Sequence, residues 1–156
     1  MTLEFKYNKS GLRTQKVKKV RDVITETTDY VMSNKTLISM KKGNDTLYFS
    51  YDMSSGSPVM VTYNGARYTY VKNLLGDIVA LADASGSIVC EYKYDAWGKP
   101  LSVTGTMAQT IGALNPFRYR GYIWDEDMEN YYLQLSRLTA AAALDGYSLP
   151  VSALIS

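Results

Sequence analysis

The feature that most constrains the fold of this chain is an internal repeat, in which aromatic residues are followed by Asp or Asn and, three positions later, by Gly. Full copies occupy residues 5–11, 70–76 and 92–98, a copy with one inserted residue occupies 49–56, and a shortened copy without aromatic residues occupies 83–86. A chain of 156 residues that keeps returning to one short pattern is expected to build one small structural unit many times.

The pattern predicts a strand, a tight turn and a second strand. Residues i and i+2 of a strand point to the same face, so Tyr92 and Tyr94 are expected to place their rings side by side on one surface. The Asp or Asn can accept hydrogen bonds from the backbone just downstream, and the Gly supplies the positive φ that ends the turn. Tyr suits such a position because its ring packs on a sheet face while its hydroxyl stays hydrated.

Turn signals between the copies indicate an all-β fold. Asn64-Gly65 is the strongest two-residue hairpin signal in the sequence, and about ten short strands fit between residues 2 and 103. Residues 14–32 are rich in β-branched side chains and lack a helix cap, which favours two strands over a helix. We predict consecutive antiparallel strands and hairpins in a curved or spiralling sheet, with a short helical or irregular C-terminal tail.

Composition excludes several kinds of chemistry. The hydrophobic and charged fractions, 46% and 21%, are those of a globular domain, and 14 Tyr residues contrast with the lack of His. Without His there is no Ser-His-Asp or Cys-His catalysis, and the single Cys90 can form neither an internal disulfide nor a thiolate cluster. A net charge of +2 gives no electrostatic argument for nucleic acid, and no signal peptide or membrane span is recognisable. No catalytic residue, cofactor or metal is expected.

Two charged clusters allow alternative interpretations. A basic cluster is interpreted as a solvated strand face or, alternatively, as a phosphate-binding patch, and consists of Lys16, Lys18, Lys19 and Arg21. An acidic cluster is interpreted as a solvated loop or, alternatively, as a paired-carboxylate or hard-cation site, and consists of Asp125, Glu126, Asp127 and Glu129. Asn130 is expected to take the positive φ in that loop.

The pattern changes after the last copy of the repeat. Residues 106–114 are compatible with a loop and one helical turn, which the following Asn115-Pro116 would stop. Residues 117–125 return to alternating aromatic side chains, and residues 131–134 look like their antiparallel partner. We therefore expect an aromatic hairpin after the helical turn.

Tyr-Asp and related dipeptides recur before Gly, and the block Asn115-Pro116-Phe117-Arg118-Tyr119-Arg120-Gly121-Tyr122 follows them; in these features the sequence resembles the Rhs/YD-repeat family. It is similar to the segment of bacterial Rhs proteins that runs from the last repeats into the Rhs repeat-associated core. The resemblance covers residues 3–137 and implies three regions: a YD-repeat sheet (1–105), the start of the core (106–137) and a divergent Ala-rich tail (138–156).

In that family the repeats wind as a long β-sheet into a hollow shell, and a variable C-terminal segment, often a toxin, is enclosed within it. The resemblance implies that this chain is a structural piece of such a shell, without catalysis of its own, whose partners are neighbouring YD repeats and a C-terminal effector. Family members are secreted or associated with the cell surface. The expected structural repeat positions are Tyr7, Asn8, Gly11, Tyr51, Asp52, Gly56, Asn73, Gly76, Tyr94, Asp95, Gly98, Tyr119, Arg120 and Gly121.

The sequence also departs from the family. Asp-Pro, around which the family's self-cleavage segment is built, does not occur, so autoproteolysis is not expected. We expect a truncated or degenerate reading frame, or an excised fragment, whose strand edges near Phe5 and near the C-terminus lead the isolated chain to self-associate. The alternatives to a structural role are an aromatic surface for carbohydrate or protein, using Trp97 and Trp124, and a carboxylate-based or metal-dependent enzyme using the acidic cluster.

Overall fold

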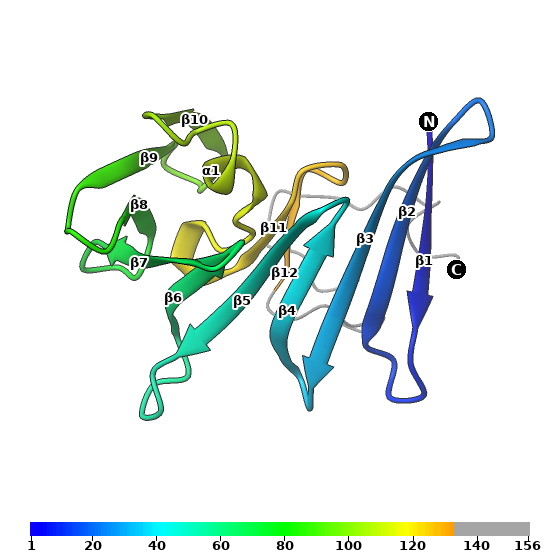
Figure 1. Cartoon of the computed structure of the whole chain (residues 1–156), viewed down its shortest axis with the longest axis horizontal. Helices are drawn as coiled ribbons and strands as arrows, with labels where there is room; N and C mark the ends of the chain where they lie inside the picture. The colour runs from blue at the N-terminus through cyan, green and yellow to red at the C-terminus, as the bar shows by residue number, and fades with distance from the viewer. Residues whose placement is uncertain (133–156) are drawn as a thin grey trace. The chain divides into compact units, whose positions relative to one another are not determined.

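The computed structural model describes residues 1–132, and these form the predicted all-β fold (Figure 1). Ten antiparallel strands follow one another in chain order, and two further strands form a separate hairpin. The strands are β1 (Thr2–Tyr7), β2 (Arg13–Val20), β3 (Val23–Ser33), β4 (Thr36–Lys42), β5 (Asp45–Tyr51), β6 (Pro58–Tyr63), β7 (Ala66–Lys72), β8 (Ile78–Ala82), β9 (Ile88–Tyr94), β10 (Pro100–Thr104), β11 (Ile123–Asp125) and β12 (Asn130–Tyr132). Two short helical elements, α1 (Ile111–Leu114) and η1 (Tyr119–Gly121), lie between β10 and β11.

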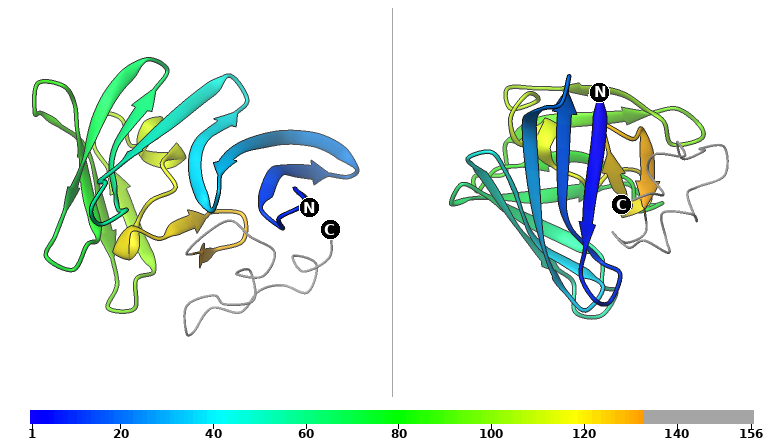
Figure 2. Two further views of the ribbon diagram at one scale, coloured as in Figure 1. Left: turned by 90° about the horizontal axis from the view of Figure 1, so that it is seen from below. Right: turned by 90° about the vertical axis from the view of Figure 1, so that its right-hand side faces the viewer.

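The chain folds as two compact units, of which the first contains, among the described residues, 1–46 and 123–132. Within this unit β1–β4 form successive hairpins, and the β11–β12 hairpin lies beside them (Figure 2). Phe5 of β1 and Met128 of the β11–β12 loop pack together, with Leu3 and Tyr7 against them. The hairpin thus removes apolar side chains of β1 from water.

The second unit contains residues 47–122. Side chains alternate along its strands: in β5, Leu47 and Phe49 are buried whereas Tyr48 is 55% exposed. The segment after β10 lies on one face of this sheet (Figure 2), and Ile111 of α1 is completely buried there. The core of the unit is therefore the layer between the sheet and this segment.

The hairpin turns follow the twist of the strands. Asn64 and Gly65 both have positive φ, +48° and +88°, as a two-residue hairpin turn requires, which confirms the predicted hairpin. In the neighbouring β5–β6 hairpin the register shifts between Ser50 and Tyr51, next to the turn. Such bulges increase the local twist and bend the strands, so the sheet curves.

The aromatic block before β11 is not a strand, contrary to the prediction. Tyr119–Gly121 form a short 3-10 segment instead, which is interrupted at Arg120 because this residue has a non-helical φ of +55°. The backbone N–H of Arg118 donates to the Tyr122 carbonyl at 3.0 Å, and that of Arg120 donates to Asp77 Oδ1 at 2.9 Å. These bonds close a compact loop, so the backbone groups are not available for a ladder with another strand.

The loop between β11 and β12 also differs from the prediction. Glu129, not Asn130, has the positive φ, +49°. Asn130 is the first residue of β12 and pairs with Asp125, so its backbone is extended. The predicted antiparallel pairing of the two aromatic stretches is confirmed in this hairpin.

Residues from 133 onward lie outside the described part of the chain, and with them the predicted Ala-rich tail, residues 138–156. The domain boundaries expected at 105 and 137 stay predictions. Of the helices formed by residues 1–132, none is both long and apolar enough to cross a membrane.

Candidate functional site

Asp and Asn side chains organise the turns of the repeat. Asn8 Oδ1 accepts hydrogen bonds from the backbone N–H groups of Ser10, at 2.9 Å, and Leu12, at 3.0 Å. The same bonds, from the residues two and four positions on, are accepted in other copies by Asn73, Asp83 and Asp95. Asp52, whose copy has the inserted residue, bonds instead to the backbone two and three positions on. Each turn ends at a Gly with positive φ, so one local device recurs through the chain.

Several predicted repeat positions meet in the second unit. Asp77 joins them, because its carboxylate accepts from the Asn73 side chain at 2.8 Å and from the Arg120 N–H at 2.9 Å. Tyr119 packs beside Tyr94, with ring centroids 5.8 Å apart. We call this group the turn junction; it consists of Asn73, Gly76, Asp77, Tyr94, Gly98, Tyr119, Arg120 and Gly121.

Gly98 is required in the turn junction for two reasons: it has a φ of +91°, and it leaves space for the Tyr119 ring because it has no side chain. A Cβ at this position would lie 2.3 Å from the Tyr119 ring, far inside van der Waals contact. Gly86 ends another copy of the turn at φ +87°, and a Cβ there would meet nothing within 4 Å. The predicted positions outside the junction lie at the β1–β2 turn (Tyr7, Asn8, Gly11), the β5–β6 turn (Tyr51, Asp52, Gly56) and the β9–β10 turn (Asp95).

Asn115 is the polar centre of the second unit, although the sequence suggested for it only a helix stop. Its side chain is buried, and Oδ1 accepts from the Tyr70 hydroxyl at 2.7 Å and from the Phe117 N–H at 3.2 Å. Nδ2 donates to the Tyr92 hydroxyl at 3.2 Å and to the Phe117 carbonyl at 2.7 Å. A carboxamide can form two bonds through its oxygen and two through its nitrogen, and all of these are present. Asn115 therefore fixes the segment after α1 to strands β7 and β9.

Arg118 is a buried cation that forms no ion pair with any carboxylate of the described residues. Its guanidinium donates to the carbonyls of Asn115 at 2.9 Å, Gly112 at 3.1 Å and Ala113 at 3.3 Å. These carbonyls belong to the C-terminal end of α1, where helix carbonyls lack partners within the helix. The guanidinium carbon also lies 4.5 Å from the centre of the Tyr92 ring. Carbonyl dipoles and an aromatic face thus replace a counter-ion.

The hydroxyls of the central tyrosines are not hydrated, contrary to the prediction. Tyr70 and Tyr92 are buried, and the Tyr92 hydroxyl donates to the Gly112 carbonyl at 2.7 Å. The hydroxyl of half-buried Tyr94 donates to the Ile78 carbonyl at 2.6 Å. Burial raises the pKa of both Tyr70 and Tyr92, so their hydroxyls remain hydrogen-bond donors throughout the neutral range. The tyrosines therefore bind the covering segment to the sheet.

The two charged clusters of the sequence are partners of each other. In the first unit Asp125 pairs with Arg13 at 2.9 Å and with Lys16 at 2.8 Å. Asp127 pairs with Lys16 at 2.9 Å and with Lys18 at 2.8 Å. Arg13, Lys16 and Asp125 are buried. For Lys16 and Asp125 the solvated strand face and the solvated loop were wrong interpretations. We call this group of five residues the ionic cluster.

Three other members of the two charged clusters take no part in the ion pairs of the ionic cluster. Lys19 pairs with the exposed Glu4 at 2.7 Å. Arg21 lies in the β2–β3 turn with a φ of +52°. Glu126 accepts a hydrogen bond from the Trp124 indole N–H at 2.7 Å. The residues of the alternative interpretation, a phosphate-binding patch, are therefore divided among different partners.

The charges of the ionic cluster stabilise one another. Burial alone would raise the pKa of Asp125, but the charges of Lys16 and Arg13 outweigh it and lower the pKa. Burial likewise opposes ionisation of Asp127, and hydrogen bonds from Lys18 and Lys16 lower its pKa. The pKa of Lys16 is raised, because Asp125 outweighs the effect of burial. Carboxylates held ionised by fixed cations are poorly suited to act as general acids near neutral pH.

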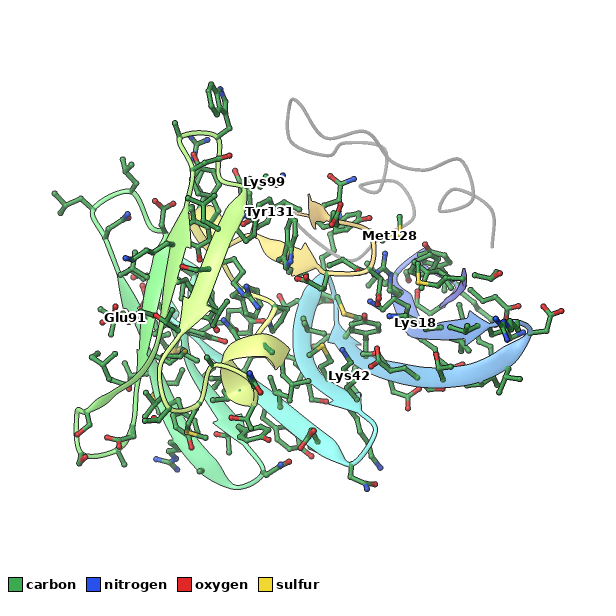
Figure 3. The ribbon with its side chains drawn as sticks, turned by 90° about the horizontal axis from the view of Figure 1, so that it is seen from above. Lys18, Lys42, Glu91, Lys99, Met128 and Tyr131 are labelled. Atoms are coloured by element: carbon green, nitrogen blue, oxygen red, sulfur yellow. The ribbon has the colours of Figure 1, made fainter. Side chains whose placement is uncertain are left out.

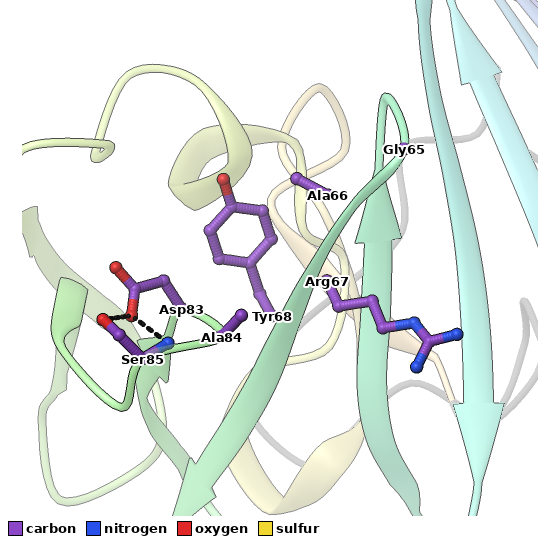
Figure 4. Close-up of a pocket in the computed structure, with 7 residues that line it drawn as sticks. All are labelled: Gly65, Ala66, Arg67, Tyr68, Asp83, Ala84 and Ser85. Carbon is purple, nitrogen blue, oxygen red and sulfur yellow. Dashed lines mark hydrogen bonds between the residues drawn. The ribbon is translucent and has the colours of Figure 1, made fainter.

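A shallow hollow of about 580 Å³ lies between the β6–β7 and β8–β9 turns of the second unit (Figure 4). Its lining consists of Gly65, Ala66, Arg67, Tyr68, Asp83, Ala84 and Ser85. The Asp83 carboxylate already accepts hydrogen bonds from the Ser85 hydroxyl at 2.7 Å and the Ser85 N–H at 3.0 Å. Because its acidic group is occupied in this way, we do not assign the hollow as a catalytic site.

The aromatic surface expected as an alternative loses one of its two members. Trp124 is only 9% exposed, whereas Trp97 is 78% exposed in the β9–β10 turn. Cys90 is buried, and burial raises the pKa of its thiol, which disfavours the reactive thiolate. Within residues 1–132 no three His, Cys, Asp or Glu side chains are grouped as a metal site would require.

Comparison with known proteins relates the chain to a stretch of much larger ones. It is 35% identical over 132 residues to the tRNA3(Ser)-specific nuclease WapA of Bacillus spizizenii and 36% identical over 133 residues to the tRNA nuclease WapA of Bacillus subtilis. The chain is similar to a segment of WapA. Each match covers 83% of the chain but only 5% of the relative's length.

Solved structures share the fold of the chain. The crystal structure of TcdB2-TccC3-Cdc42 matches 85% of the chain with a TM-score of 0.62 at 15% identity, and that of TcdB2-TccC3 matches 83% with a TM-score of 0.57 at 16% identity. The chain spans 7% of each of those chains. No known family model matches the sequence. At these identities the solved structures show a shared fold.

Proposed function

We propose that this chain is a structural segment of an Rhs/YD-repeat β-shell and has no catalytic activity of its own. The observation that carries the proposal is the use of the polar side chains. Asn115 and Arg118 hold the covering segment on the sheet of the second unit, and Asp125 holds the β11–β12 hairpin in the first. Polar side chains that could otherwise take part in catalysis are thus engaged in internal contacts, as a rigid shell requires.

Enclosure is the mechanism that suits this construction. Each strand–turn–strand unit hydrogen-bonds to the next along the sheet, and the repeated Asp or Asn turn reproduces the same geometry each time. Bulges beside the turns curve the sheet, which a shell needs. The proposed partners are neighbouring YD repeats and a C-terminal effector, and the proposed location is secreted or at the cell surface.

The WapA relatives are named tRNA nucleases, and this chain matches 5% of their length. We propose that nuclease activity does not lie in the matching stretch, because the chain contains no His and its paired acids are bound to cations. Purified chain incubated with tRNA and Mg²⁺ is expected to leave the tRNA intact. Cleavage that disappears in Asp127→Asn would contradict the proposal.

An exchange experiment tests the structural role. The matching stretch of Bacillus subtilis WapA is replaced by this chain, and the chimera is subjected to limited proteolysis beside the parent WapA. The chimera is expected to resist cleavage as the parent does, whereas a chimera carrying Asn115→Ala and Arg118→Ala is expected to be cut. A chimera that is cleaved at once, although the isolated chain is folded by circular dichroism, would refute the proposed role.

A further inference from the structure

The two rows of turns in the second unit, one at each end of its strands, differ in composition. Each row is called an edge here. Successive hairpins of an antiparallel sheet point in opposite directions, so the β5–β6, β7–β8 and β9–β10 turns share one edge and the β6–β7 and β8–β9 turns share the other. The first edge carries large apolar side chains that are almost fully exposed: Met53 (102%), Leu74 (106%), Leu75 (76%) and Trp97 (78%). We call these residues the apolar turn edge. The turns of the opposite edge contain small or polar residues, Asn64-Gly65 and Asp83-Ala84-Ser85-Gly86.

The fold does not require apolar side chains in these turns. In the β8–β9 turn the Asp carboxylate accepts the same backbone hydrogen bonds, and small residues, Ala84 and Ser85, fill the central positions. The corresponding positions of the β7–β8 turn hold Leu74 and Leu75, and Trp97 lies in the β9–β10 turn. Because turn formation does not depend on these large side chains, their exposure suggests a surface with a partner.

Backbone N–H groups at the tips of the β7–β8 and β9–β10 turns are already hydrogen-bonded within their turns. Asn73 Oδ1 accepts a hydrogen bond from the Leu75 N–H at 3.0 Å, and Asp95 Oδ1 accepts one from the Trp97 N–H at 2.8 Å. Backbone N–H groups that are already paired within the turn lose less on leaving water than unpaired ones would. The two central turns can therefore leave water at reduced cost.

Two exposed cations and the half-buried Lys72 lie near these tips. Lys72 precedes the β7–β8 turn, Lys99 follows the tip of the β9–β10 turn (Figure 3), and Arg120 is joined to the turn junction through its N–H. Lys99 and Arg120 are exposed, whereas Asp77 is buried and Asp95 is half-buried. The carboxylates of Asp77 and Asp95 also accept hydrogen bonds within the protein. Apolar tips bordered by Lys and Arg combine burial among acyl chains with attraction to lipid phosphates.

We propose that the apolar turn edge docks on the surface of a lipid bilayer that contains anionic phospholipid, with Leu74, Leu75 and Trp97 inserted at the boundary between headgroups and acyl chains. Met53 lies at the margin of the contact. Its neighbour Asp52 stays ionised, because hydrogen bonds from Ser55 and Ser54 lower the pKa of Asp52 to about 2. This interaction goes beyond the shell role proposed above and does not depend on it.

Vesicle binding of the full chain tests the proposal. The probes are phosphatidylcholine vesicles with and without phosphatidylglycerol, and the measurements are co-sedimentation and quenching of tryptophan emission by brominated lipid. We expect binding to the vesicles with phosphatidylglycerol, and quenching that Trp97→Ala abolishes. The double variant Leu74→Ser, Leu75→Ser is expected to bind about tenfold more weakly or worse.

Ile88→Ser is the matched control, since Ile88 is 48% exposed and follows the turn of the opposite edge. It should change binding by less than about twofold. Circular dichroism verifies that each variant is folded. The proposal is overturned by a lack of binding, by equal binding without phosphatidylglycerol, or by an equal loss in Ile88→Ser. A blue shift of Trp97 emission that grows with protein concentration without vesicles would also overturn it, because a second copy of the chain would then cover the edge.

Discussion

The β11–β12 hairpin of the first unit and the segment after β10 in the second are both fastened by buried polar groups, but the groups differ in charge. In the first unit Asp125 lies between the cations Arg13 and Lys16. In the second, neutral Asn115 forms all four hydrogen bonds of its side chain, and hydrogen bonds to backbone carbonyls stabilise the cation Arg118. One unit thus depends on ionised side chains, and the other depends chiefly on dipoles.

This difference has consequences for stability. A buried carboxylate between cations holds only while it is ionised, and removing it leaves uncompensated charge in a medium that solvates charge poorly. A carboxamide with every bond formed does not titrate, and its contribution depends on geometry alone. The two units should therefore respond differently to acid and to substitution.

The largest effect is expected for Asp125→Asn, which leaves Arg13 without an ionised partner in the ionic cluster. Breaking a buried pair in this way costs about 3–5 kcal/mol, so the free energy of unfolding measured in urea should fall by that amount. Glu129→Gln removes the same charge from an exposed position of the same loop and should have little effect. Equal effects of the two variants would indicate that only net charge matters.

Asn115→Ala should lower the stability of the second unit by about 2–4 kcal/mol, since it leaves the Tyr70 hydroxyl and the Phe117 backbone without these partners. Tyr70→Phe removes one of these bonds and should cost only about 1 kcal/mol. Chemical denaturation at low and high salt separates this unit from the first, because the loss in Asn115→Ala should not depend on salt. If the stability loss in Asn115→Ala depended strongly on salt, the second unit would depend on charge as the first does.

Gly98→Ala should destabilise the second unit by about 2–3 kcal/mol, because the added Cβ meets the Tyr119 ring and the positive φ is strained. Gly86→Ala has the same strain without the contact, so about 1 kcal/mol is expected. Thermal unfolding of the two variants under one buffer condition measures the difference. Identical losses would mean that Tyr119 does not need the space.

The smallest effect is expected for Lys19→Ala, which removes the pair with Glu4 at the surface of the first unit. Exposed pairs contribute little, so the loss in urea denaturation should stay below about 1 kcal/mol. A loss as large as that of Asp125→Asn would show that burial does not set the strength of the ion pairs in this unit.

Local patterns predict much of this fold. The spacing of Asp or Asn to Gly indicates the turns, and Asn64-Gly65 indicates its hairpin, because these conformations are determined within a few residues. Alternating aromatic residues did not reveal that Tyr119–Gly121 form a 3-10 turn, since side chains that pack from a loop can alternate as those of a strand do. Asn115 was interpreted as a helix stop because nothing local identifies the hydroxyls that surround it.

The ionic cluster could not be predicted from local spacing. Arg13 and Asp125 are 112 positions apart, and Lys16 and Asp125 are 109 positions apart. Each charged run alone has the composition of a solvated surface, and only the tertiary fold brings the two together. The candidate site residues named from the repeat therefore describe the turns, whereas the fasteners Asn115 and Arg118 emerge only from the structure.

Hydrogen exchange across an acid titration tests most directly whether the two polar groups are fasteners of different kinds. Asp125 and Asp127 have lowered pKa values, so their contribution is present at neutral pH and is lost as the pH falls through those values. As the pH is lowered below the ordinary carboxyl range, about pH 4, and after correction for intrinsic exchange rates, the β11–β12 hairpin should lose protection while α1 and Asn115 keep theirs. Simultaneous loss in both units, or a hairpin that stays protected throughout, would contradict the account.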